Sequence, residues 1–187
     1  IQNGTLTEKM AEYLKKSVVS GKSIIISGST SSGKTTFLNM LTSFIPTEER
    51  IITIEDSAEL NIRHRNIVRM ETRNANTEGY GEIKMRALIK AALRMRPDRL
   101  LIGEVRDESA LELLTAMCTG HSGSMSTIHA NSAEDTLVRL ETMALWEGHV
   151  HAEAIKRMIV SGVDIIIYLE RNERGRMVKA TMEVNKN

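Results

Sequence analysis

The sequence has few aromatic residues and no excess of charge of either sign. Phe, Tyr and Trp make up 3% of the 187 residues, and 25 basic side chains nearly balance 24 acidic ones, for a net charge of +1. Proteins that hold single-stranded nucleic acid commonly combine a basic groove with aromatic side chains that stack on the bases. The composition therefore counts against a nucleic-acid partner and against general attraction to anionic lipid.

Cysteine and long apolar runs are also scarce. The one cysteine, Cys118, cannot form an internal disulfide and cannot supply the paired cysteines of a structural zinc site. No apolar run approaches the ~20 residues that span a bilayer, and the first residues lack the hydrophobic core of a signal peptide. We therefore expect any membrane contact to be indirect, through a partner protein. Because the sequence does not begin with Met, we also expect residues 1–187 to be one domain of a longer protein.

Apolar residues recur with two periods along the chain, and this predicts alternating helices and strands. The expected helices are 7–20, 35–44, 82–95, 108–117, 132–145 and 151–161. The expected strands are 23–27, 50–56, 66–71, 99–104, 123–131, 163–170 and 176–184. Several of these strands are short apolar runs, which is typical of a parallel sheet covered by helices on both faces. The pattern predicts an α/β fold with a mainly parallel sheet and, around Gly175, a C-terminal antiparallel hairpin.

A phosphate-binding motif follows the first predicted strand. Residues 28–35 read GSTSSGKT and match G-x-x-x-x-G-K-[ST]. Its two glycines permit backbone angles that aim N–H groups into one concavity, and the following helix adds its N-terminal dipole. Lys34 is expected to contact the β- and γ-phosphates, Thr35 to bind Mg²⁺, and Thr36 to contact a phosphate oxygen. The predicted nucleotide-binding residues are Gly28, Ser29, Thr30, Ser31, Ser32, Gly33, Lys34, Thr35 and Thr36.

Polar side chains end three other predicted strands, where open parallel sheets bind ligands. Glu104 follows the run LLIG and is expected to orient and deprotonate the water that attacks the γ-phosphate. Glu55 and Asp56 end another strand, and adjacent carboxylates suit Mg²⁺, partly through its water shell. Asp56 equally suits a cap on the next turn. His129 ends a third strand, where it is expected to sense the γ-phosphate. The predicted catalytic residues are thus Glu104, Glu55 and His129.

Arginine and lysine side chains four residues apart form a stripe on the predicted helix 82–95. A solvated helix face explains this spacing as well as a functional role does. In the functional alternative, Arg94 or Arg96 reaches nucleotide phosphates or a neighbouring subunit, as arginine fingers do. The sequence leaves both interpretations open.

Four motifs, in order along the chain, resemble those of the secretion-superfamily traffic ATPases. GSTSSGKTT, TIEDSAEL, RMRPDRLLIGEVRD and GHSGSMSTIHANS resemble the Walker A motif, Asp box, Walker B motif and His box of this family, which powers type II and type IV secretion and the assembly and retraction of pili. The segments VRMETRNANTEGYGEI and ALRMRPDRLLIGEVR are most similar to the Flp (tight-adherence) pilus ATPases, the CpaF-like branch. The resemblance extends from about Leu6 to Leu169.

The resemblance implies a RecA-like P-loop ATPase domain that uses ATP and Mg²⁺. It also implies a homo-hexameric ring at the cytoplasmic face of the inner membrane, where platform and assembly proteins are the partners. Glu55 is matched to the acid of the Asp box, Glu104 to the Walker B glutamate and His129 to the His-box histidine. Ser31 departs from the glycine that many relatives have there. On this resemblance, we expect the family's N-terminal domain, which helps to clamp the nucleotide and supplies arginines, to lie outside residues 1–187.

Three other functions fit part of the pattern. A DNA-translocating RecA-like motor shares the core and would bind DNA in a salt-sensitive way. A small-molecule kinase would need an arginine-bearing lid, and a catalytically idle scaffold would bind nucleotide without turnover. A guanine-specific switch would usually carry an Asn-Lys-x-Asp loop, which the sequence lacks. The sequence favours an ATP-hydrolysing motor domain for pilus assembly or protein secretion.

Overall fold

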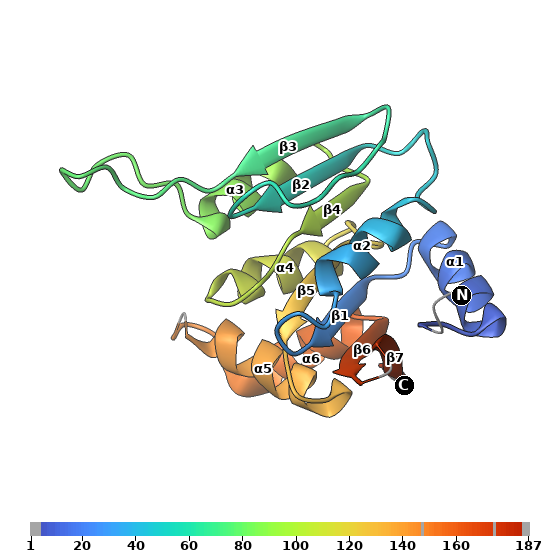
Figure 1. The fold of residues 1–187 in the computed structure, drawn as a ribbon. Coiled ribbons are helices and arrows are strands. Elements are labelled where there is room, and N and C mark those ends of the chain that lie inside the picture. The colour runs from blue at the N-terminus through green and yellow to red at the C-terminus, as the bar shows by residue number, and fades with distance from the viewer. Residues whose placement is uncertain (1–4, 147, 174, 185–187) are drawn as a thin grey trace.

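A twisted sheet runs through the centre of the protein in the computed structural model, which describes residues 5–146, 148–173 and 175–184 (Figure 1). The sheet has seven strands in the order β3-β2-β4-β5-β1-β6-β7. The strands are β1 (Ile24–Gly28), β2 (Ile51–Glu55), β3 (Ile67–Glu71), β4 (Arg99–Ile102), β5 (Met125–His129), β6 (Ile165–Asn172) and β7 (Gly175–Glu183). Every pairing is parallel except the antiparallel hairpin of β6 and β7. The predicted mainly parallel sheet and C-terminal hairpin are confirmed.

The helices cover both faces of this sheet. They are α1 (Glu8–Val19), α2 (Lys34–Thr42), α3 (Met85–Leu93), α4 (Ser109–Cys118), α5 (Ala133–Leu145) and α6 (Ala152–Gly162). Successive side chains of a strand point to opposite faces, so Ile24 and Ile26 pack with α1 and α2, while Ile25 packs with the core of α3 to α6. All three isoleucines are fully buried. Burial on both faces explains why the strands read as continuous apolar runs.

The predicted helix 82–95 is shorter than expected. Residues 72–84 instead form an arm that projects from the body of the molecule (Figure 1), closed at its base by an antiparallel bridge between Arg73 and Ile83. Part of the charged stripe on α3 is linked to α4, because Arg86 and Lys90 both contact the buried carboxylate of Glu112, at 2.6 and 3.3 Å. Lys90 and Arg94 are nevertheless exposed, so the stripe is also a solvated helix face.

The parallel topology brings the predicted site residues to one edge of the sheet. Gly28, Glu55 and His129 are the last residues of β1, β2 and β5, and Glu104 follows β4 after one glycine. In the register of the sheet, Gly28 lies directly beside His129. Because these strands are parallel neighbours, their carboxyl ends form one rim, where doubly wound sheets place their ligands.

Candidate active site

The phosphate loop joins β1 to α2, and its backbone explains its glycines. A Cβ atom on Gly28 would lie 2.4 Å from the carbonyl oxygen of Leu169 and 2.6 Å from Ser32 Oγ, so no larger residue fits. Gly33 has φ +94° at the start of α2, a conformation that glycine adopts without strain. Ser31 has φ +61°, a left-handed conformation that is uncommon for residues with a side chain. A glycine at this position would remove that strain.

Lys34 is held inside the loop. Its Nζ atom donates hydrogen bonds to the carbonyl oxygens of Gly28 and Ser29, at 3.1 and 3.0 Å, and lies 3.4 Å from Nδ1 of His129. Burial lowers the pKa of Lys34, and the nearby carboxylate of Glu104 partly opposes that effect. The ammonium group is therefore already oriented toward the loop, where a phosphate oxygen could take the place of a carbonyl.

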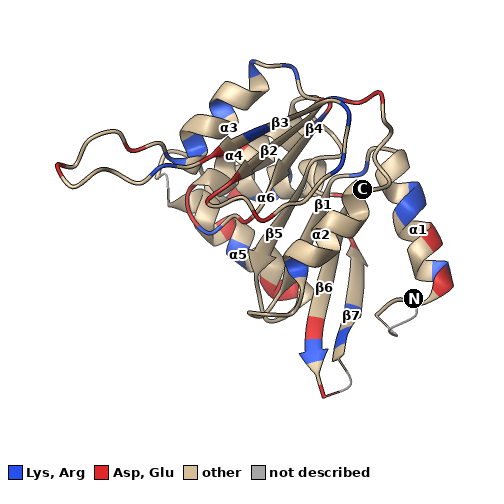
Figure 2. Ribbon diagram, turned by 45° about the horizontal axis from the view of Figure 1, so that its top comes forward, with Lys and Arg blue, Asp and Glu red and all other residues tan. Residues whose placement is uncertain are grey.

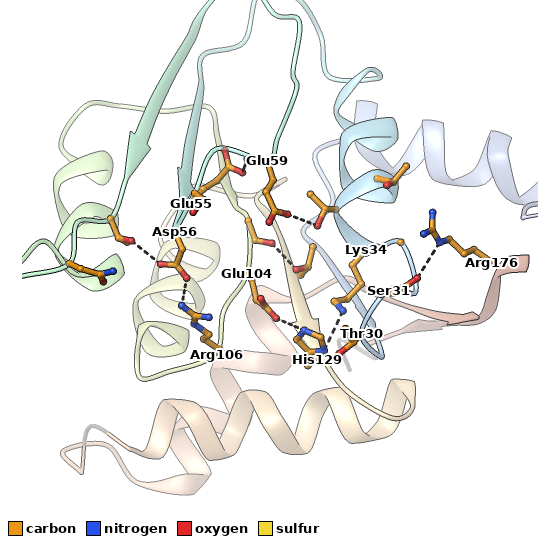
Figure 3. Close-up of a pocket in the computed structure, with 18 residues that line it drawn as sticks. Thr30, Ser31, Lys34, Glu55, Asp56, Glu59, Glu104, Arg106, His129 and Arg176 are labelled. Carbon is orange, nitrogen blue, oxygen red and sulfur yellow. Dashed lines mark hydrogen bonds and ion pairs between the residues drawn. The ribbon is translucent and has the colours of Figure 1, made fainter. Parts of the chain in front are cut away.

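Glu104 and His129 form a contact pair beside Lys34 (Figure 3). The His129 Nε2 atom lies 3.0 Å from Glu104 Oε1, while the other ring nitrogen faces Lys34. Both side chains are partly open to solvent, 44% for His129 and 31% for Glu104. A carboxylate, an imidazole and an ammonium group thus follow one another along the rim, from β4 through β5 to the phosphate loop.

The carboxylates of the TIEDSAEL segment differ from one another in their contacts. Glu55 is 3% exposed, and its Oε1 atom accepts hydrogen bonds from the backbone N–H groups of Glu59 and Leu60, at 3.0 and 2.8 Å. Glu59 Oε2 lies 3.4 Å from the Thr35 hydroxyl. The sequence reasoning missed Glu59 because it lies in a loop, four residues beyond the strand end. The only indication in the sequence was that Glu59 belongs to the same acidic segment as Glu55 and Asp56.

These oxygen atoms fit Mg²⁺ bound together with a nucleotide. Hydroxyl and carboxylate oxygens are the ligands that Mg²⁺ prefers, and it usually takes one or two from the protein and the rest from phosphate and water. Among the described residues, no three His, Cys, Asp or Glu side chains form a metal cluster by themselves. The Thr35 hydroxyl and the Glu59 carboxylate lie within hydrogen-bond distance of each other. The Glu55 carboxylate accepts backbone hydrogen bonds instead, and its predicted role toward Mg²⁺ stays a prediction.

Two arginines that the sequence analysis did not single out lie on opposite sides of the pocket (Figure 3). Arg106 follows Glu104 closely in the chain, and its Nη2 atom lies 2.5 Å from Asp56 Oδ2. Arg176, on β7, donates from Nε to the carbonyl oxygen of Ser31, at 3.1 Å. The pairing with Arg106 gives Asp56 a structural partner.

Arg94 and Arg96 lie away from this site. Both are exposed, at the end of α3 and in the turn that leads into β4. That turn is at the amino end of the strands, and the phosphate loop is at their carboxyl end. The expectation that they reach phosphates held by the same chain is therefore wrong; a contact with a neighbouring subunit stays a prediction.

The rim encloses a polar cavity of about 740 Å³. This volume lies within the ~300–1,000 Å³ range of small-molecule sites. The side chains that line it come from α2, from the ends of β2 and β5, from β7 and from the loops after β1, β2 and β4. They include Thr30, Ser31, Lys34, Thr35, Glu55, Asp56, Glu59, Glu104, Arg106, His129 and Arg176. Its position and charges match a site for a triphosphate and a cation.

Comparison with known proteins agrees with this geometry. The family described as "Type II/IV secretion system protein" matches residues 1–179. The chain belongs to this family. Protein VirB11 of Rhizobium radiobacter is 40% identical over 158 residues, which are 83% of this chain and 46% of that protein. The conjugal transfer protein TrbB of the same species is 35% identical over 187 residues, 98% of this chain and 55% of TrbB.

Comparison with solved structures leads to ATPases of secretion and pilus machines as well. The VirB11 ATPase from the Brucella suis type IV secretion system, in complex with sulphate, superposes with a TM-score of 0.85 at 30% identity and covers 94% of this chain and 52% of its own. The pilus retraction motor PilT with bound ADP gives a TM-score of 0.76 at 26% identity, with 99% and 53% covered. The fold is RecA-like, as predicted. The chain spans about half the length of the curated relatives it matches. Within the described residues, no helix has the length and apolar character of a membrane span.

Proposed function

We propose that this chain is the ATP-hydrolysing domain of a ring-forming motor for a secretion or pilus machine. The observation that carries the proposal is the convergence of Lys34, His129 and Glu104 at the phosphate loop, with contacts of 3.4 and 3.0 Å. The relatives support it, because their descriptions include a type IV secretion ATPase and a pilus retraction motor. We further propose that residues 1–187 form a single RecA-like domain of a longer protein.

Different residues of the site would serve ATP binding, Mg²⁺ binding and hydrolysis. Lys34 and the loop N–H groups would bind the phosphates of ATP, and Thr35 with the carboxylate of Glu59 would hold Mg²⁺. The ion would neutralise phosphate charge when it is bound. Glu104 would orient and deprotonate the attacking water. His129 lies between that base and the lysine, so occupation of the γ-phosphate position would change its contacts, consistent with a sensor role.

The assembly we propose is a homo-hexamer at the cytoplasmic face of the inner membrane, working on platform or assembly proteins. The partial exposure of Glu104 and His129 supports a site that a second subunit completes. Within the family, we propose the Flp (tight-adherence) branch, because of the two segments that resemble it. Basic and acidic residues are intermixed on the described elements in Figure 2, which supports a protein partner over DNA.

The test is the ATP turnover per subunit, measured against protein concentration for wild type and Glu104→Gln. We expect turnover to rise with concentration, and the variant to bind ATP but lose about 100-fold or more of its rate, the scale of a lost general base. Glu153→Gln, which changes a carboxylate on α6 far from the pocket, is the matched control. A flat rate would favour a site complete in one chain, and near-normal turnover of Glu104→Gln would assign the base to another residue. Stimulation by DNA would favour a translocating motor.

A further inference from the structure

The arm of residues 72–84 is ordered by its own hydrogen bonds although it is almost wholly exposed. It projects beyond the end of β3 (Figure 1), and every residue from 73 to 82 is exposed to solvent. The N–H group of Asn76 donates to the carbonyl oxygen of Tyr80 at 2.8 Å. The side-chain oxygen of Asn76 accepts from the N–H groups of Glu78 and Tyr80, at 3.1 and 2.8 Å. The tip therefore has a defined shape.

This tip presents an aromatic ring and acidic groups. The side chain of Tyr80 is 72% exposed, and aromatic side chains are common anchors of protein interfaces. Residues 74–82 include Glu78 and Glu82 but no Lys or Arg. Glu82 lies 3.9 Å from Lys84 at the base of the arm, whereas Glu78 forms no ion pair with a described residue. The tip is thus suited to a positively charged partner surface.

Four exposed arginines lie at the opposite end of the sheet, in the loop before β3 and the turn before β4. The N–H group of Ile51 donates to the carbonyl oxygen of Asn66, and that of Asp98 to the carbonyl oxygen of Arg50, both at 2.9 Å, so these two segments flank the start of β2. Figure 2 shows basic residues in blue in both segments. The arginine cluster consists of Arg63, Arg65, Arg94 and Arg96. None of them forms an ion pair with a described residue.

We propose that the arm of one subunit docks on the arginine cluster of the next subunit, with Tyr80 stacked on an arginine side chain and Glu78 paired with a guanidinium group. A planar guanidinium stacks on aromatic rings and donates two hydrogen bonds to a carboxylate. Arg96 has φ +52°, a strained conformation that is often found at functional positions. The proposal rests on the proposed ring, because it names two surfaces that neighbouring copies bring together.

The positions of the two surfaces favour a second copy of this chain over an unrelated partner. The arm leaves the carboxyl end of β3, whereas the arginine cluster lies at the amino ends of β3 and β4. A contact between two different surfaces of identical chains is head-to-tail, and it closes into a ring when the rotation between copies permits. One chain thus carries both halves of a contact that can repeat around a ring.

The arm begins at the wall of the nucleotide cavity. Thr72 and Asn74 line that cavity, and the Thr72 hydroxyl donates to Asp56 Oδ1 at 2.9 Å. A neighbouring subunit that holds the arm would therefore fix one wall of the site. Association and ATP turnover would be coupled through this wall, although the arm tip itself lies outside the cavity.

Crosslinking of the full-length protein tests the contact directly. Tyr80→Cys and Arg94→Cys are made separately in a Cys118→Ser background, because Cys118 is exposed, and the two variants are mixed with a short bismaleimide. We expect mixed crosslinked dimers, and species larger than dimers when both cysteines are in one chain. Glu153→Cys, at an exposed position on α6, replaces Arg94→Cys in the control mixture and should crosslink much less.

Charge reversal provides a second measurement on the same protein. Glu78→Lys should weaken association about tenfold in Mg·ATP, measured by sedimentation velocity, with Mg·ATP affinity unchanged. Adding Arg94→Glu and Arg96→Glu to the same chain should restore association to within about threefold. Glu153→Lys, the matched reversal, should have no effect, and urea unfolding would show that all variants are folded.

Two results would overturn the docking of the arm: crosslinking to Arg94→Cys no greater than to Glu153→Cys, or association unchanged by Glu78→Lys. If wild-type turnover still rises with concentration and is lost in Glu104→Gln, the proposed ring motor stands and only the arm contact is wrong. A flat turnover together with absent crosslinks would overturn both proposals.

Discussion

Glu55 offers a direct test of whether the acids of this site have separate structural and chemical roles. Glu55→Ala would remove the acceptor of two backbone hydrogen bonds, from Glu59 and Leu60, inside a region where the Glu55 side chain is 3% exposed. The side chain of Leu60 is itself buried in the core beneath α2. We expect the substitution to disrupt this turn and lower the free energy of unfolding. We do not expect it to act directly on a chemical step.

The expected magnitude follows from these contacts. A hydrogen bond to a charged group contributes about 1.5–3 kcal/mol, so two would give about 3–6 kcal/mol if the backbone could not move. The turn after β2 can relax and admit water, which favours the lower end, about 3 kcal/mol. Glu55→Gln keeps an oxygen acceptor and should lose about 1 kcal/mol. Glu104→Gln, at a partly open position, should lose less than about 1 kcal/mol.

Urea denaturation followed by circular dichroism measures these free energies, and ATP turnover is measured below the unfolding transition. We expect opposite outcomes for the two variants: Glu55→Ala is destabilised, whereas Glu104→Gln is stable and inactive. A Glu55→Ala variant as stable as wild type would refute the structural assignment. A folded Glu55→Gln with turnover as low as that of Glu104→Gln would return Glu55 to the catalytic role that the sequence suggested.

Three further outcomes are expected. Lys34→Ala should lower Mg·ATP affinity about 100-fold or more, because the loop loses its cation; isothermal titration calorimetry measures this, and unchanged affinity would contradict the phosphate-loop assignment. Gly28→Ala should lower the free energy of unfolding by about 3 kcal/mol through backbone overlap. Gly79→Ala, which also has positive φ but open space around it, should cost only about 1 kcal/mol; equal losses would show that overlap is not the cause. Finally, burial and the hydrogen bond to Glu183 raise the pKa of Tyr13 to about 12. The folded state therefore keeps this proton longer than the unfolded state, whose tyrosine has an ordinary pKa of about 10, and the resulting stability declines as pH rises from about 10 through 12. Tyr13→Phe should have a flatter unfolding profile over that range, and an unchanged slope would disprove the linkage.

Features that depend on local pattern could be predicted from the amino-acid sequence. The phosphate loop is a contiguous motif, and its glycines and Lys34 are needed wherever such a loop occurs. Apolar runs separated by amphipathic segments predicted the parallel sheet. Once the strands are parallel, residues that end them must share an edge, so Glu104 and His129 could be placed together without a structure.

The tertiary structure decided the contacts between segments that no spacing relates. Arg176 lies 145 residues from Ser31 in the chain and reaches it because β6 pairs beside β1 and the hairpin returns to the loop. The binding of Glu55 to the backbone, and the orientation of Glu59 toward Thr35, depend on how one turn folds over α2. The charge pattern of the predicted helix 82–95 suggested a functional role for Arg94, but the topology places Arg94 at the edge of the sheet opposite the phosphate loop. Local pattern specifies which residues end a strand, whereas only the packed chain determines which side chains meet there.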